Sequence, residues 1–243
     1  MPDTLALTRL LNQLFGGIVA SVLHAVGLPA TPATAINNDF ALELLVAAGL
    51  IVFFLAVRLT LSVDKPNGLQ QVAEMIHEFV GGQGEQIIGH GHERFQSFAT
   101  CIFLFVVLCN LIGLIPGIIT PTSHPVVPLG IAFLTFLYYN FHGVRVQGPV
   151  NYVKHFAGPL WWLAPLMFPI EIVSHLARIM SLTIRLYANM LASDLLTLVF
   201  FSMLPWVLPS AFLGLHFVVS LIQAYVFMLL TMIYLSQAVA KEH

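Results

Sequence analysis

Two long runs without a charged residue constrain this sequence most. No Asp, Glu, Lys or Arg occurs in the 50 residues from 95 to 144, and none in the 46 residues from 195 to 240. Because one membrane-spanning helix needs about 20 apolar residues, each run has room for more than one crossing or for one very oblique crossing. The sequence therefore predicts an all-α integral membrane protein.

The composition agrees with that prediction and excludes several other classes. Charged residues make up 8% of the chain and hydrophobic residues 58%, whereas about a quarter of an ordinary soluble domain is charged. The net charge is −2 without a basic cluster, which argues against nucleic-acid binding. No glycine-rich phosphate loop occurs, so we expect no nucleotide site and no cofactor. Cys101 and Cys109 fall within an apolar run and are predicted to be small buried side chains, not a disulfide.

The apolar segments predict about five membrane-embedded helices and one amphipathic helix on the membrane surface. The spans are expected near residues 40–61, 97–119, 129–144, 169–204 and 210–241. In residues 69–89, apolar side chains alternate with Gln and Glu, which is typical of a surface helix, and Gly81, Gly82 and Gly84 are expected to weaken its second half. We expect residues 1–38 to form an external segment, amphipathic and interrupted at Gly16 and Gly17, and residues 39–243 to form a single transmembrane domain.

The last two predicted helices are too long for upright crossings. After Pro169 itself, residues 169–204 contain neither Gly nor a further Pro. They correspond to about 54 Å of helix, whereas the hydrocarbon core is about 30 Å thick. The sequence therefore predicts a long, strongly tilted hairpin, joined between Pro205 and Pro209 and packed against a protein partner.

The basic residues predict the orientation. They occur in three regions, which contain Arg58, Lys65 and Arg94, then Arg145 and Lys154, then Lys241. Since lysine and arginine are enriched in cytoplasmic loops, these regions are expected on the cytoplasmic side. The connections at 120–128 and 205–209 lack basic residues and are expected outside, which places the N-terminus outside and the C-terminus in the cytoplasm.

The ionisable and strongly polar side chains within the predicted spans concentrate in the hairpin. Its first helix contains Glu171, His175, Arg178, Arg185, Asn189 and Asp194, and its second contains His216, Ser220 and Gln223. All but Asp194 of the first group share one broad helical stripe. A charge in lipid costs several kcal/mol and marks an ion path or a paired partner. Arg185 is the most informative, because its guanidinium stays protonated and cannot relay a proton, but can hold a neighbouring carboxylate ionised.

Each of these residues also has a purely structural interpretation. Arg178 could simply pair with Glu171, His175 could be an interfacial polar residue, and Ser220 could bond to its own helix backbone. The acids of its own helix are too distant to pair with Arg185. The segment His90–Gly91–His92–Glu93 lacks the spacing of a zinc protease and is expected to be a solvated loop.

Two rival classes place the same residues in other roles. In a self-contained transporter, Arg185 would hold a substrate anion, but that class predicts internal repeats and broken helices. An intramembrane enzyme would need a nucleophile with its base, or metal ligands, at mid-depth. The sequence contains no evident repeat, and residues 169–204 are uninterrupted.

Three segments carry a family resemblance. Residues 181–192 have the sequence SLTIRLYANMLA, residues 223–231 after His216 have QAYVFMLLT, and residues 110–116 have NLIGLIP. In content, order and spacing they closely resemble subunit a of the membrane sector of rotary ATP synthases. The resemblance covers roughly residue 39 to the C-terminus.

The resemblance implies a role for each matching residue. Arg185 would be the stator arginine that meets the carboxylate of a rotor ring, with Asn189 and Gln223 beside it. Asp194 and His216 would belong to the proton path from the outer side, Asn110 to the aqueous route, and Glu171 would match an acid of the same region. Glycine is common in the family where this chain has Ser193, and we expect little consequence from that difference.

The family also implies partners and a location. These are the ring of c subunits, the peripheral-stalk b subunits and the rest of the ATP synthase, in a bacterial inner membrane. The expected function is to couple proton flow through two aqueous half-channels to ring rotation and ATP synthesis. The chain would not be catalytic alone, and no metal or cofactor is implied.

Overall fold

The computed structural model describes residues 5–25, 31, 35–62, 66–89, 91–115, 118–148, 164–203 and 207–239. The long helices are α1 (Ala6–Ala25), α2 (Asn38–Leu59), α3 (Gly68–Ile88), α4 (Glu93–Leu111), α5 (Val126–Gln147), α7 (Ala164–Met203) and α8 (Val207–Val239). Two short 3-10 turns, η1 (Ile112–Leu114) and η2 (Pro121–Ser123), lie between α4 and α5. These ranges contain no strand, which confirms the all-α prediction.

Six of the helices are long and apolar enough to cross a membrane, one more than the sequence predicted. The additional one is α1, which continues through Gly16 and Gly17, so the predicted interruption there is wrong. Asn12 exchanges two hydrogen bonds with the backbone of Ile36, at 2.9 and 3.1 Å, and Thr8 donates to Asn38 at 2.8 Å. These contacts attach α1 to the start of α2. They offset the cost of interior glycines, about 0.5–1 kcal/mol each.

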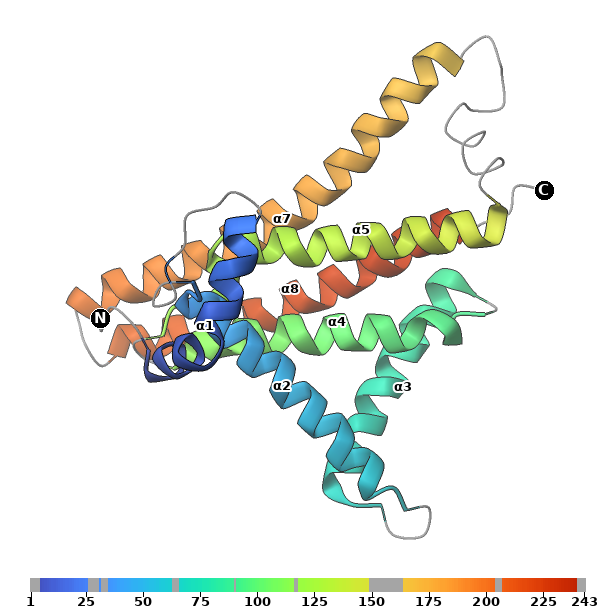
Figure 1. The fold of residues 1–243 in the computed structure, drawn as a ribbon. Helices are drawn as coiled ribbons and strands as arrows, with labels where there is room; N and C mark the ends of the chain where they lie inside the picture. The colour runs from blue at the N-terminus through green and yellow to red at the C-terminus, as the bar shows by residue number, and fades with distance from the viewer. Residues whose placement is uncertain are drawn as a thin grey trace.

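Four helices form the core of the molecule. In Figure 1, α4, α5 and α8 run side by side, α7 crosses them obliquely, and the N-terminal end of α7 projects away from the bundle. The largest buried cluster joins all four helices through Val106, Ile131, Leu186, Met190 and Phe227. Many large apolar side chains point outward instead, as expected where lipid replaces water at the surface.

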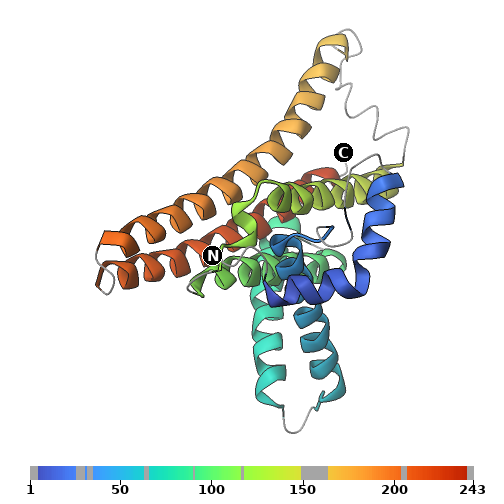
Figure 2. The same ribbon diagram turned by 60° about the vertical axis from the view of Figure 1, so that its left-hand side comes forward.

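Helices α2 and α3 form a hairpin that projects from this bundle (Figure 2). Helix α3 continues through the glycines that were predicted to weaken its second half. A side chain at Gly81 would come within 2.5 Å of Gln96 Nε2, and one at Gly84 within 3.3 Å of His92. These glycines therefore let α3 approach the first turns of α4 closely. Val72 and Phe79 of α3 are exposed, which agrees with an amphipathic helix that contacts lipid.

Several helices begin earlier than predicted, because they contain a proline in their first turn. Pro128, Pro165 and Pro209 all lie within the first three residues of α5, α7 and α8. A proline is tolerated there because the missing N–H would have no partner in the helix. Pro169 lies further inside α7 and costs one hydrogen bond. The second predicted span was too long at its end, since α4 stops at Leu111 before the η1 turn.

Some predictions fall outside the described residues. These concern Lys65, His90, Lys154, Pro205 and Lys241. Both cysteines are free; Cys109 is buried as predicted, but Cys101 is exposed on the outer face of α4, so its predicted burial is wrong.

Candidate functional site

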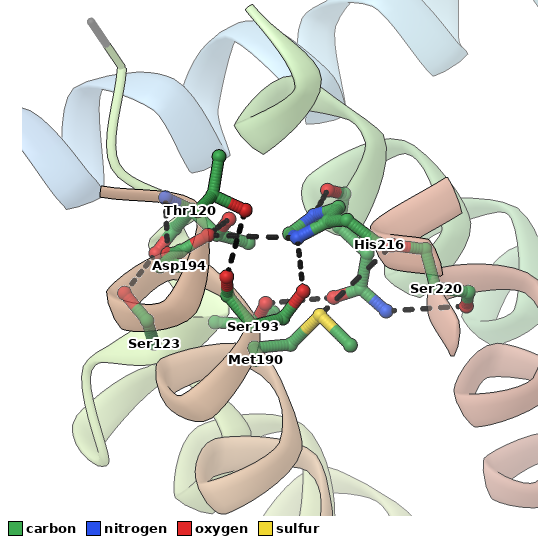
Figure 3. A network of polar contacts seen from close by, with 10 residues as sticks. Thr120, Ser123, Met190, Ser193, Asp194, His216 and Ser220 are labelled. Carbon is green, nitrogen blue, oxygen red and sulfur yellow. Dashed lines mark hydrogen bonds and ion pairs between the residues drawn. The ribbon is translucent and has the colours of Figure 1, made fainter. Parts of the chain in front are cut away.

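Buried polar side chains gather where α4, η2, α7 and α8 meet (Figure 3). Six of them are less than a tenth exposed, namely Asn110, Thr120, Thr122, Ser193, His216 and Ser220. Asp194 is partly buried beside them. Since an unpaired buried polar group is costly, such a cluster persists only when its members bond to one another.

The carboxylate of Asp194 is held by the segment that precedes η2. Thr120 donates its hydroxyl to Oδ1 at 2.9 Å and its backbone N–H to Oδ2 at 3.2 Å. Ser123 in turn donates to the Thr120 carbonyl at 2.7 Å. Asp194 therefore faces away from the stripe of Arg185, as the helical wheel predicted, and both of its oxygens have a fixed donor.

The imidazole of His216 lies next to that carboxylate and is 1% exposed. Its Nδ1 is 2.8 Å from Ser193 Oγ and 3.7 Å from Asp194 Oδ1, while its Nε2 is 3.1 Å from the Asn110 carbonyl oxygen. The ring is thus fixed from both sides, by α7 and by α4. At 3.7 Å the carboxylate and a protonated imidazole form an ion pair, and direct proton exchange requires the two groups to approach to about 2.6–3.2 Å.

Asn110 connects the rest of the cluster. Its side-chain oxygen accepts from Thr122 at 2.6 Å, and its amide donates to the Ser220 carbonyl at 3.4 Å. The Ser220 hydroxyl lies 4.0 Å from Met190 Sδ, so the predicted bond to its own helix backbone is not present.

Gly113 in η1 makes this arrangement possible. A side chain on Gly113 would overlap the Thr120 hydroxyl and lie 3.1 Å from His216 Nε2. Only glycine leaves room for both groups, so the turn after α4 shapes the cluster as much as its polar side chains do.

Arg185 lies elsewhere, on the outward face of α7. It is exposed, as are Ser181, Ile184 and Ala188 around it. Its guanidinium makes one long hydrogen bond, from Nη2 to Ser181 Oγ at 3.5 Å. Among the described residues no carboxylate forms an ion pair with it. Asn189 on the same helix and Gln223 on α8 are partly buried, and neither amide side chain bonds to another described residue.

Glu171 belongs to a third group, nearer the start of α7. Its Oε1 is 3.5 Å from His175 Nε2, and His175 Nδ1 is 2.8 Å from the hydroxyl of Tyr139, which is 1% exposed. Arg178 lies over the ring of Tyr234, 5.1 Å from its centroid, and not beside Glu171. The interpretation of Arg178 and Glu171 as an ion pair is therefore wrong, and His175 is a contact between α7 and α5.

Of the seven site residues that the sequence indicated, the structure brings Asn110, Asp194 and His216 together and leaves the other four apart from them. Sequence reasoning missed Gly113, Thr120, Thr122 and Ser193. The available signals were a run of hydroxyl residues in an uncharged loop and a serine beside Asp194. The small consequence expected of Ser193 conflicts with its contact to His216.

Comparisons with known proteins point to one family. The model of the family described as ATP synthase A chain matches residues 40–236. A protein of Koribacter versatilis named ATP synthase subunit a is 50% identical over 244 aligned positions, which cover all of both chains. Proteins of the same name are 48% identical in Solibacter usitatus, over 85% of this chain and 88% of the relative, and 42% identical in Helicobacter hepaticus, over 85% and 94%.

Proposed function

Because this chain belongs to the ATP synthase subunit a family, we propose that it is the proton-translocating stator subunit of a rotary ATP synthase. The chain is a multi-pass membrane protein, a component of the ATP synthase and not a catalyst by itself. In the proposal it supplies two aqueous half-channels and an arginine that faces the ring of c subunits.

The exposed guanidinium of Arg185 carries this proposal. It lies on an outward face of α7 among small and apolar side chains, without an acid of the described chain to pair with. A permanent positive charge facing lipid costs several kcal/mol. A neighbouring protein that brings a carboxylate to this face removes that cost, and a rotor ring with one acid per subunit brings such a carboxylate repeatedly.

The buried cluster supports an entry route on one side of the membrane. Protons from outside reach Asp194 and His216, with Asn110 beside them, and neutralise the ring carboxylate. A neutral carboxyl can cross the lipid, whereas an ionised one cannot do so cheaply. Each proton that moves down the potential yields about 2.3 kcal/mol per 100 mV.

The exit route lies on the other side of Arg185. Its positive charge favours the ionised form of the returning carboxyl and repels a proton that would pass straight between the half-channels. Asn189 and Gln223 line this contact. Glu171 lies near the start of α7, away from Asp194 and His216, so we assign it to the inner half-channel and not to the outer region that the resemblance implied, and there it receives the released proton.

The length of α7 supports a tilted contact with the ring. Its 40 residues correspond to about 60 Å, twice the thickness of the hydrocarbon core, so the α7–α8 hairpin tilts within the bilayer. Arg94 opens α4 and Arg145 closes α5, which brings both to one end of the bundle. In the proposal that end faces the cytoplasm, and α1, although long enough to cross the membrane, lies on the outer side. The membrane is a bacterial inner membrane, where b subunits complete the stator.

The decisive experiment is Arg185→Ala in the whole complex. We expect ATP-driven proton pumping in reconstituted vesicles to be lost, while Arg58→Ala, at the end of α2, pumps normally. Full pumping by Arg185→Ala refutes the stator role. A self-contained transporter instead predicts ion movement by this chain without the c ring, and the unbroken α7 speaks against that class.

A further inference from the structure

The contacts of His216 determine where its protons lie. The carbonyl oxygen of Asn110, 3.1 Å from Nε2, can only accept a hydrogen bond. Nε2 must therefore carry the hydrogen. A neutral imidazole has only one N–H, so Nδ1 carries a free lone pair in that state.

The lone pair on Nδ1 needs a donor, and Ser193 is placed to provide it. Its Oγ lies 2.8 Å from Nδ1, within hydrogen-bond distance, and the serine is 9% exposed. Asp194 Oδ1 is 3.7 Å from the same nitrogen, and it already accepts the Thr120 hydroxyl at 2.9 Å. In the neutral state, Ser193 thus donates to His216, and the carboxylate remains a second, more distant neighbour.

The charged surroundings of the ring are simple. Among the described residues, Asp194 of α7 is the only charged group within ion-pair distance of it. The neighbouring groups from α4, η1 and the segment before η2 are uncharged, namely Asn110, Gly113 and Thr120. Without the serine hydroxyl, Asp194 becomes the nearest polar group to Nδ1. For a neutral ring, a hydrogen bond from Nδ1 to the carboxylate is then more favourable than the bond from Nε2 to the Asn110 carbonyl. The hydrogen therefore moves to Nδ1, and the Asn110 carbonyl is left without a donor.

We propose that Ser193 is a positioning residue that holds neutral His216 with its hydrogen on Nε2, so that Nδ1, on the side of Asp194, takes up each incoming proton. This inference rests on the proposed outer half-channel. Uptake forms one N–H bond at Nδ1 and turns the imidazole into an imidazolium. The Ser193 hydroxyl rotates from donor to acceptor, and it rotates back when the imidazolium gives its proton up towards the ring carboxylate.

The direct test is the tautomer of His216. Nitrogen NMR of the assembled complex with labelled histidine distinguishes the two neutral forms, and His216→Gln identifies the signal. We expect hydrogen on Nε2 in the wild type and a large population with hydrogen on Nδ1 in Ser193→Ala. Hydrogen on Nδ1 in the wild type, or an unchanged spectrum in Ser193→Ala, overturns the inference. The wild-type measurement stands even if the variant fails to assemble.

Proton pumping gives the functional test. We expect Ser193→Ala to pump about fivefold more slowly, the factor that corresponds to one net hydrogen bond. The matched control is Thr197→Ala, whose hydroxyl donates only to the backbone carbonyl of Ser193, at 2.9 Å. This variant keeps the Ser193 hydroxyl, and it should pump like the wild type. Arg185→Ala, run in parallel, separates the two claims. If it is inactive while Ser193→Ala equals the wild type, this inference fails alone; if it pumps, the proposed function fails.

Discussion

Replacing Gly113 by alanine tests the geometry of the buried cluster without removing a polar group. The added methyl would overlap the Thr120 hydroxyl and come within 3.1 Å of His216 Nε2, a nitrogen held by the Asn110 carbonyl. Thr120 is the residue that donates to both oxygens of Asp194. The overlap must therefore move either the donor of the carboxylate or the imidazole.

The expected size of the effect follows from those contacts. Overpacking a well-packed site costs about 1–3 kcal/mol when the surroundings cannot shift. Here Thr120 can shift, at the expense of its hydroxyl bond to Asp194, and a hydrogen bond to a charged group contributes about 1.5–3 kcal/mol. If the arrangement of side chains that conducts protons is destabilised by about 2 kcal/mol, pumping becomes about thirtyfold slower.

The assay is ATP-driven acidification of vesicles that contain the reconstituted complex, normalised to the amount of assembled enzyme. Gly130→Ala on α5 is the matched control, because nothing lies within 4 Å of its new methyl group. Thr120→Ala should slow pumping less than Gly113→Ala, because it removes the same hydroxyl bond without placing a methyl group against His216 Nε2. Wild-type pumping by assembled Gly113→Ala would refute the argument that this glycine makes room for Thr120 and His216.

Two further predictions follow from the same contacts. Asp194→Ala should slow coupled pumping more than Ser220→Ala. The Asp194 carboxylate has two hydrogen-bond donors and His216 beside it, whereas the Ser220 hydroxyl only approaches Met190 Sδ. Equal rates of the two variants in the pumping assay would count against a place for Asp194 on the proton path. Gly81→Ala should destabilise the protein by about 1–3 kcal/mol, because the Gln96 amide must leave its 2.6 Å bond to the His77 carbonyl to make room. Gly82→Ala, with open space around it, should leave the thermal denaturation midpoint unchanged or raise it slightly, and equal midpoints for the two variants would contradict the packing argument.

The fold was largely predictable because lipid imposes a simple rule on sequence. A segment that crosses the bilayer must be apolar and helical, so long, predominantly apolar segments located all five predicted spans. The ends of the spans were less predictable. Prolines in a first turn are compatible with a helix. Helix α1 depends on contacts between Asn12 and Ile36, which no local sequence pattern predicts.

The candidate site was likewise only partly predictable from the sequence. Helical periodicity placed Arg185 and Asp194 on different faces of one helix, as the structure has them. It could not place Asn110 or Thr120, because the contacts that bring them to His216 and Asp194 join residues 106 and 74 positions apart. Ser193 was underestimated for a related reason: its importance depends on which side chain of another helix lies opposite it.

One hydrogen bond in the buried cluster is not removed by ordinary side-chain substitutions. The donor to Asp194 Oδ2 is the peptide N–H of Thr120, so almost every replacement at this position preserves it. A saturation screen at position 120 would thus underestimate how strongly the acid relies on this loop. Thr120→Pro is the informative exception. The φ of −61° at Thr120 already suits a proline ring, so this substitution removes the two donors to Asp194, the backbone N–H and the hydroxyl, without changing the backbone conformation. Any other replacement at position 120 that lacks a hydroxyl therefore loses the hydroxyl bond to Asp194 but keeps the part of the anchor that lies in the main chain.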